Sequence, residues 1–252
     1  MRSIPCLFCL ALAARADDKR RYHLLDPTPR SLMRPLSADR PDVTESPYTV
    51  DAGRFQIEAS VLEWTRDDGD VFSILPVNLK AGLFPDVDAQ LVFAPLVFDG
   101  HGDDAGSFDD ATLRVKFNVW GNDEGDTAFA VMPFLTVPTD VDSDEVTGGM
   151  IFPFAAALPG DWGLGLMAEV DYLGNSEYQL VTTASVGHTI SGDLAGFLEF
   201  ANAAGEGPWA ASLNAGVTYG VSEDLQLDAG VRIGLTDAAD DFSFFAGFTL
   251  RF

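Results

Sequence analysis

Charged side chains that could bind or orient a solute recur at alternate positions inside short apolar runs. In residues 111–120, Arg114 and Lys116 alternate with Leu113, Val115 and Phe117, so an extended segment carries its cations on one face and its apolar side chains on the other. Ten such charged residues are predicted to line one common interior: Arg54, Glu58, Lys80, Arg114, Lys116, Glu169, Asp171, Glu199, Asp228 and Arg232.

Two kinds of chemistry fit these residues equally well. Cations on one wall and acids on another would form opposed charge ladders that orient small polar or aromatic acids. The same residues would instead form ion pairs that brace a plugged interior. Alternation alone does not separate the two, because it concerns only the faces of the strands.

Strands must position these residues, because from Gly53 onward apolar and polar side chains alternate with period two between Gly, Asp and Asn clusters. The pattern is weakest in residues 127–137 and 147–158, where both faces carry apolar residues and Pro133 and Pro153 weaken a ladder. Twelve strands are predicted: 53–65, 71–83, 89–98, 111–120, 127–137, 147–158, 162–172, 178–189, 194–202, 209–220, 225–235 and 242–252.

The placement of charge favours a membrane barrel over a soluble β-sandwich. In a barrel the apolar face meets lipid, where a cation costs roughly 2 to 4 kcal/mol at the midplane. The cations of the predicted strands all fall on the polar phase. We therefore predict an all-β fold, an antiparallel up-and-down transmembrane β-barrel of about twelve strands over residues 53–252. A sandwich with solvated outer faces is the alternative.

The ends and connections of the predicted strands point to the bacterial outer membrane. Twelve is an even number, and the longer connections, 99–110 and 138–146, alternate with short turns, as in single-chain bacterial barrels. The last strand alternates through Phe248 and Leu250 to a terminal Phe252. This ending resembles the signal by which barrel-assembly machinery recognises such proteins, so that machinery and outer-membrane lipids are expected partners.

The N-terminal part of the chain divides into two segments. Residues 1–16 have a positive start, an apolar stretch and a small-x-small end, which together are typical of a secretory signal peptide that carries both cysteines. Residues 17–52 form a proline-rich arm, because each proline removes an amide donor and favours extended backbone. The arm is either a disordered leader or a segment that enters the lumen as a plug or gate, through Asp39, Arg40, Asp42 and Glu45.

Composition and missing motifs exclude several functions. A formal net charge of −24 excludes nucleic acid as a partner, because phosphates need a basic face. The three histidines, His23, His101 and His188, stand without a nucleophile motif, so a barrel-borne hydrolase is a minor alternative. We predict no enzyme activity, no cofactor and no metal site, because no His/Cys cluster or glycine-rich phosphate loop occurs.

The start of the barrel region resembles a known family. The run from Ala38 to Val50, ADRPDVTESPYTV, followed by Gly53 to Glu58, GRFQIE, resembles the opening of a bacterial outer-membrane transporter-like family named for a MetA pathway of phenol degradation. The resemblance covers about residues 36–252. It implies an outer-membrane barrel for passive passage of small solutes, with aromatic ones suggested by the family name. A non-conducting structural barrel is the main alternative. Twelve strands leave a narrow lumen at most.

Overall fold

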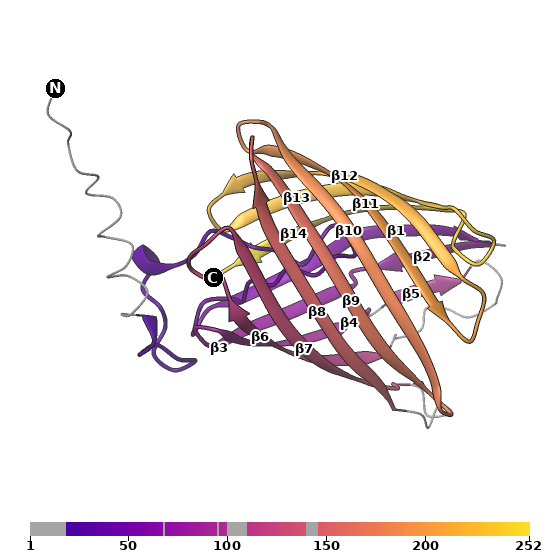
Figure 1. Cartoon of the computed structure of the whole chain (residues 1–252), viewed down its shortest axis with the longest axis horizontal. Helices are drawn as coiled ribbons and strands as arrows, with labels where there is room; N and C mark the ends of the chain where they lie inside the picture. The colour runs from indigo at the N-terminus through magenta and orange to yellow at the C-terminus, as the bar shows by residue number, and fades with distance from the viewer. Residues whose placement is uncertain (1–18, 68, 95, 100–109, 140–145) are drawn as a thin grey trace, which may run out of the picture.

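Alternating side chains form a single closed sheet in the computed structural model, which describes residues 19–67, 69–94, 96–99, 110–139 and 146–252 (Figure 1). One 3-10 turn, η1 (Arg30–Leu32), precedes the strands. The strands are β1 (Phe55–Asp67), β2 (Gly69–Ile74), β3 (Val77–Phe84), β4 (Val87–Phe93), β5 (Leu96–Asp99), β6 (Ala111–Trp120), β7 (Thr127–Val137), β8 (Thr147–Leu158), β9 (Trp162–Gly174), β10 (Glu177–Ser191), β11 (Leu194–Gly205), β12 (Ala210–Ser222), β13 (Leu225–Gly234) and β14 (Phe242–Arg251).

Two of the predicted strands are interrupted, so the fourteen strand segments form a barrel of twelve strands. β2 and β3 pair with β1 in one continuous register, from Glu63 opposite Ser73 to Phe55 opposite Ala81, and the break falls where Leu75 adopts a φ of 58°. β5 likewise continues the pairing of β4 through β2. All neighbours are antiparallel, and β14 pairs with β1 to close the ring. The predicted barrel of about twelve strands is therefore confirmed.

The barrel is inverted relative to a soluble protein, with its polar side chains inside and its apolar side chains outside. In β6, Lys116 is fully buried whereas Leu113 is 52% exposed and Val119 57% exposed on the outer surface. This is the pattern that a lipid-facing barrel requires. In the described part of the chain no helix is long and apolar enough to cross a membrane.

The interior wall is not uniformly polar, which explains the mixed pattern of residues 127–158. Met132 of β7, Ile151 of β8 and Met167 of β9 are buried together on the inner face, with Phe134 and Val181 packed beside them. These strands are apolar on both faces because one face forms the outer surface of the barrel and the other forms this inner patch. The alternation of polar and apolar residues is therefore weak in this region.

Three inward phenylalanines lie flat along the wall over glycines of the adjacent strands. A Cβ built on Gly216 would approach the Phe197 ring to 2.5 Å, and one on Gly230 would approach the Phe245 ring to 2.5 Å. Phe134 lies over Gly149 in the same way, at 2.8 Å. The glycines give the rings room against the wall, so that they do not project across the lumen.

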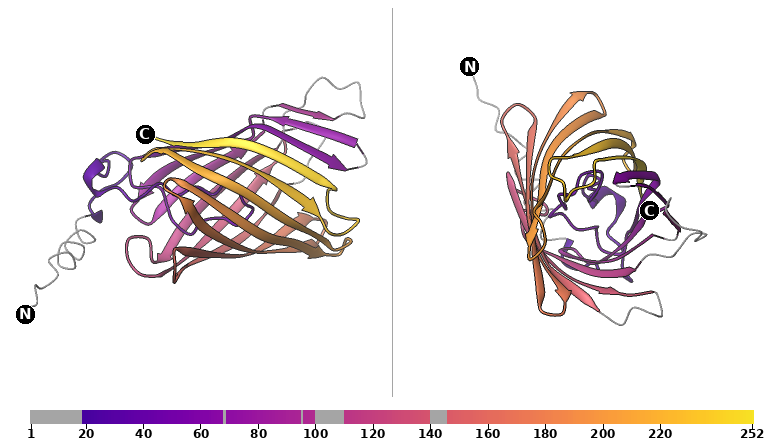
Figure 2. Two further views of the ribbon diagram at one scale, coloured as in Figure 1. Left: turned by 90° about the horizontal axis from the view of Figure 1, so that it is seen from above. Right: turned by 90° about the vertical axis from the view of Figure 1, so that its right-hand side faces the viewer.

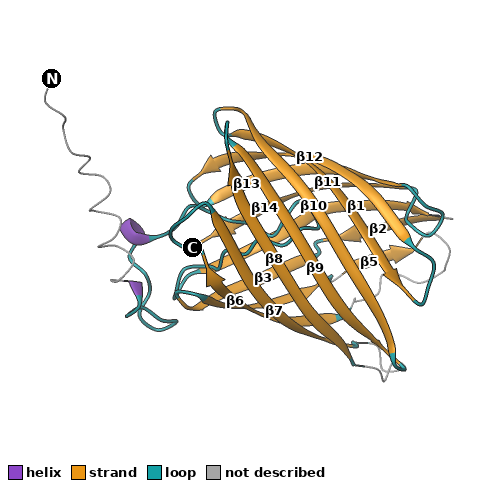
Figure 3. Cartoon of the chain, viewed as in Figure 1, coloured by secondary structure: helices purple, strands orange, loops and turns teal. Residues whose placement is uncertain are grey.

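The two ends of the barrel differ. We call the end with the connections 85–86, 121–126, 159–161, 192–193 and 223–224, where Phe252 also lies, the turn end. The opposite end, the loop end, holds the long connections between β5 and β6 and between β7 and β8. Figure 3 distinguishes strands from loops, and in Figure 2 the arm runs as a purple trace inside the ring of strands. Much of both long connections and the predicted signal peptide lie outside the described residues.

Candidate functional site: the arm inside the lumen

Residues 34–51 form a closed loop within the barrel, which we call the lumen loop. The Arg34 amide donates to Asp51 Oδ2 at 2.8 Å, so both feet of the loop meet at the turn end. Farther in, the hydroxyls of Ser37 and Ser46 lie 2.7 Å apart, and the Ser46 amide donates to Asp39 Oδ1 at 3.0 Å. The segment enters and leaves through the same end of the barrel.

Side chains of the wall satisfy the backbone amides of this loop. Both carboxylate oxygens of Glu58 accept from the Asp39 amide, at 3.1 and 3.2 Å. Glu199 accepts from the Val43 amide at 3.0 Å and the Thr44 amide at 2.7 Å. A segment without secondary structure must place each buried amide on a partner, and its prolines reduce how many partners it needs. A proline-rich sequence is therefore well suited to this enclosed position.

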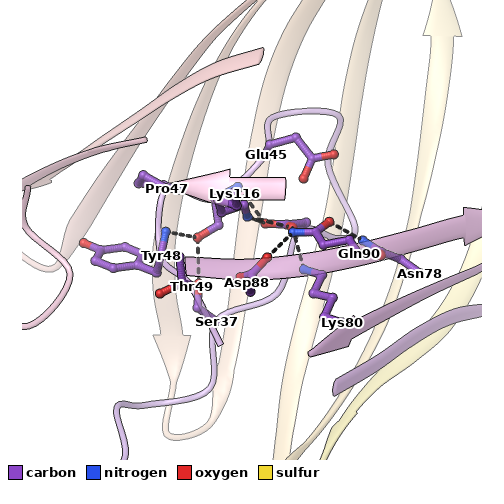
Figure 4. A network of polar contacts seen from close by, with 12 residues as sticks. Ser37, Glu45, Pro47, Tyr48, Thr49, Asn78, Lys80, Asp88, Gln90 and Lys116 are labelled. Carbon is purple, nitrogen blue, oxygen red and sulfur yellow. Dashed lines mark hydrogen bonds and ion pairs between the residues drawn. The ribbon is translucent and has the colours of Figure 1, made fainter. Parts of the chain in front are cut away.

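Asp39 is the first charged anchor of the loop. Lys116 Nζ lies 2.6 Å from Asp39 Oδ1, and Lys80 Nζ lies 2.5 Å from Asp39 Oδ2 and also pairs with Glu58. Figure 4 shows Lys80 and Lys116 with Asp88 and Gln90 beside the loop. The two lysines hold the pKa of the Asp39 carboxyl well below its usual range despite burial, so Asp39 carries its charge here.

Arg40 forms the second anchor with a two-pronged contact. Its Nε donates to Asp228 Oδ2 at 2.8 Å and its Nη2 to Asp228 Oδ1 at 2.6 Å, while Nη1 reaches Ser60 Oγ at 2.9 Å. The planar guanidinium matches the carboxylate with two parallel hydrogen bonds. Asp39 and Arg40 thus attach adjacent loop residues to β3, β6, β13 and β1.

The tip of the loop, Val43 to Glu45, lies on the wall formed by β7 to β11. Val43 packs on the patch of Met132, Ile151 and Met167. Thr44 Oγ1 lies 2.6 Å from Thr183 Oγ1 and donates to Glu199 Oε1, also at 2.6 Å. Glu45 pairs with Arg114 of β6 at 2.5 Å. The tip therefore covers the apolar patch and also contacts a charged side chain of the strand next to it, since β6 pairs with β7.

Asp42 carries an acid into an environment that disfavours its charge. Burial raises the pKa of Asp42 to about 7, and the nearby carboxylates of Glu199 and Asp39 act in the same direction. A hydrogen bond from Ser185 opposes the rise without cancelling it. The docked loop therefore favours protonated Asp42.

The other predicted lining residues do not all face the loop. Arg54 lies at the turn end, where its guanidinium donates to the Thr28 carbonyl at 2.6 Å. Glu169 and Asp171 lie on the inner phase of β9, and the guanidinium of Arg232 in β13 lies 6.0 Å from the Phe245 ring centroid. Six of the ten, by contrast, contact the loop through side-chain salt bridges or hydrogen bonds: Glu58, Lys80, Arg114, Lys116, Glu199 and Asp228.

Sequence reasoning missed three groups of lumen residues. Asp88, which accepts from the Val50 amide at 3.0 Å, was assigned to a turn because the predicted strand started at residue 89, whereas β4 starts at Val87. Lys19 and Arg34, both paired with Asp51, belong to an arm without periodicity. The inward phenylalanines had one available signal, a Phe facing a Gly in the neighbouring strand, as Phe197 faces Gly216.

Neither a catalytic histidine nor a metal cluster emerges among the described residues. The His188 ring stacks on Trp162 with 4.5 Å between centroids, and its Nδ1 lies 3.1 Å from the Asp161 carbonyl. The His23 Nδ1 accepts from the Leu25 amide, and His101 lies outside the described residues. No group of three or more His, Cys, Asp or Glu side chains placed to hold a metal ion occurs in the described ranges.

Comparisons with known proteins agree with this architecture. Residues 38–252 match the family described as "Putative MetA-pathway of phenol degradation". An outer-membrane channel from Pseudomonas putida F1 superposes with a TM-score of 0.61 at 13% identity, over 86% of this chain and 100% of that one. The NanC porin gives 0.58 at 8% identity, over 78% and 98% of the two chains, and the KdgM porin 0.52 at 10%, over 79% and 99%. No curated protein sequence matches.

Proposed function

Because this chain belongs to the family described as "Putative MetA-pathway of phenol degradation" and folds as an outer-membrane-type barrel, we propose that it is an outer-membrane channel for passive passage of small solutes. The turn end would face the periplasm and the loop end the exterior. The lumen loop would act as its gate. The observation that carries this proposal is a polar lumen occupied by a loop that enters from one end only.

The contacts of the loop decide which kind of gate is proposed. Asp39 and Arg40 are held by buried ion pairs, whereas Val43 and Thr44 at the tip rest on neutral groups of β7 to β10 and on Glu199. The tip has one ion pair of its own, between Glu45 and the partly exposed Arg114. Ion pairs with good geometry are costly to break when only one partner is removed. The anchors would therefore stay in place while the tip moves.

A permanently closed barrel is the second candidate, because the same contacts also suit a brace. Lys116 and Glu199 are almost completely buried under the loop, as expected if the lumen never opens. In that case the protein would be a structural component of the outer membrane. The two candidates differ in a single measurable property, namely current through the folded protein.

A disulfide between loop and wall tests the channel and its gate together. Protein purified from outer membranes of an expressing host would be inserted in planar bilayers, where we expect discrete current steps. The Thr44→Cys/Thr183→Cys pair, whose native hydroxyls lie 2.6 Å apart, would fix the tip to β10. The Ser37→Cys/Ser46→Cys pair joins the loop only to itself and is the matched control.

We expect oxidised Thr44→Cys/Thr183→Cys to conduct at least threefold less than its reduced form, whereas the control pair conducts like the wild type in both states. Equal currents before and after reduction would show that the tip does not gate the channel. A folded wild-type protein that passes no current would favour the structural barrel. Recovery of the protein from the inner membrane or the periplasm would contradict the localisation.

A further inference from the structure

The lumen loop does not fill the barrel evenly at the turn end. A cavity of about 660 Å³ lies between the loop and the inner face of β8 to β10, and a second of about 380 Å³ adjoins it toward β11 to β13. The two share Asp42, Gly163 and Gly187 in their linings. On the opposite side, Lys80, Asp88 and neighbouring groups are at most 4% exposed. Two further cavities, of about 690 and 490 Å³, lie at the mouth of the barrel around the feet of the loop. Beside the body of the loop, the two cavities named first place open space toward β8 to β13.

We propose that solutes pass the loop on this side, through a vestibule between it and β8 to β11 whose width is set by Gly163 and Gly187. This inference rests on the proposed channel function and deepens it. The two glycines face each other in adjacent strands, on the inner phase. The inner wall around them combines the ring of Phe197 with small side chains: Ala155, Ala157, Gly165, Ser185 and Thr189.

The glycines face empty space, unlike the glycines that pack under rings. A Cβ built on Gly163 meets no atom within 4 Å, and one on Gly187 meets only the Gly196 carbonyl oxygen at 3.7 Å. Neither glycine has a positive φ, so the backbone does not require glycine there. Neither packing nor backbone geometry explains why glycine occupies these two positions. A requirement that the vestibule stay wide does explain it.

The loop gives the vestibule its chemical preference. Asp42 and Glu45 line the cavity from the loop side, and Glu45 Oε2 is buried without a hydrogen-bond partner among the described residues. The cations that could attract an anion, Lys80, Lys116 and Arg114, are already paired with loop acids. The vestibule is therefore suited to small neutral or cationic solutes that donate a hydrogen bond, and unfavourable to anions.

Among the residues that the structure describes, the tip lies at the deep end of the vestibule. Thr44 contacts Thr183 and Val43 lies against Met167 at the point where the cavity ends. A movement of these two residues would join the vestibule to the outer half of the lumen. Asp39 lines neither cavity and Arg40 lines only the smaller one, so their ion pairs need not separate for the solute to pass.

Leucine substitution at the two glycines tests the route. We expect Gly163→Leu and Gly187→Leu each to lower single-channel conductance at least threefold in planar bilayers, because the side chain enters the vestibule. Ala184→Leu is the matched control, since Ala184 lies on the same strand but is exposed on the outer face. A shift in electrophoretic mobility on heating would establish that each variant is a folded barrel.

A cysteine at residue 187 provides an independent readout if the leucine variants fold poorly. A bulky cationic thiol reagent should block current through Gly187→Cys and leave Ala184→Cys unaffected. In a KCl gradient the wild-type reversal potential should show preference for K⁺, and preference for Cl⁻ would overturn the assigned solute class. If the two leucine variants and the modified cysteine variant all conduct like the wild type, this route is overturned and the proposed channel function is not. Absence of wild-type current would overturn the proposed function and this inference with it.

Discussion

The two sides of the lumen hold the same loop by different means. On the side of β1, β3, β4 and β6, the buried Lys80 and Lys116 meet Asp39 in ion pairs of 2.5 to 2.6 Å. On the side of β7 to β10, Val43 packs on methionine and isoleucine side chains. Next to them the wall carries glycines and alanines, which leave open space. The charged side fixes position, because paired charges tolerate little displacement, whereas apolar contacts lack directional preference and permit the tip to slide. One loop can thus be both anchored and movable.

Removal of the first anchor, Asp39, should have the largest effect on this difference between the two sides. Asp39→Ala leaves two buried lysines without their shared carboxylate, and loss of one partner from such a cluster weakens docking by about 3 kcal/mol. We expect conductance to rise and proteinase K to cleave within residues 34–51 at least tenfold faster, with sites mapped by mass spectrometry. Glu124→Ala, which removes an exposed acid of the β6–β7 connection, should behave like the wild type. If the loop of Asp39→Ala is cleaved at the wild-type rate, the charged side of the lumen does not hold the loop more firmly than the apolar side.

The second anchor should show a graded response. Arg40→Lys keeps the positive charge but loses the parallel pair of hydrogen bonds to Asp228, whereas Arg40→Ala loses both. We expect cleavage of the loop to accelerate several-fold in Arg40→Lys and more in Arg40→Ala, with both below Asp39→Ala. If lysine protects the loop as well as arginine does, charge alone holds this anchor and its geometry is irrelevant.

A change of pH should produce the smallest effect and should act on the tip. The pKa of Asp42 is raised to about 7 by burial and by Glu199, so docking favours the protonated acid. Docking is then strongest below about pH 4, the ordinary value for a free aspartate, and weakens as pH rises toward 7. We expect the open fraction in bilayers to increase a few-fold between pH 4 and pH 7 and to level off above. Asp42→Asn should flatten this profile, and an unchanged profile in that variant would assign the titration to another group.

The fold was largely predictable, because a barrel wall repeats one simple rule along every strand. Residues 111–120, 127–137 and 147–158 form strands with the predicted bounds. The interruption between β2 and β3 was not predictable, since it depends on the positive φ of Leu75. Nor was the inner apolar patch, because a strand with two apolar faces looks the same whether its second face meets lipid or a docked loop.

The site was predictable in its residues but not in its pairing. Lys80, Lys116 and Asp228 were expected in the lumen from their phase, yet alternation says nothing about which groups meet across a ring. Their partners come from a segment with no periodicity, where Asp39 and Arg40 reach opposite parts of the wall. Such contacts follow from the closed ring and the path of the loop, and neither is encoded locally.

The lumen loop has a consequence for how the protein is assembled. Its partners come from strands far apart in the sequence, Glu58 in β1, Lys116 in β6 and Asp228 in β13, and these converge only after β14 has paired with β1. Because both feet of the loop lie at the turn end, it can enter a ring that is already closed without threading a chain terminus. The full set of docking contacts therefore requires a ring that has closed in this register.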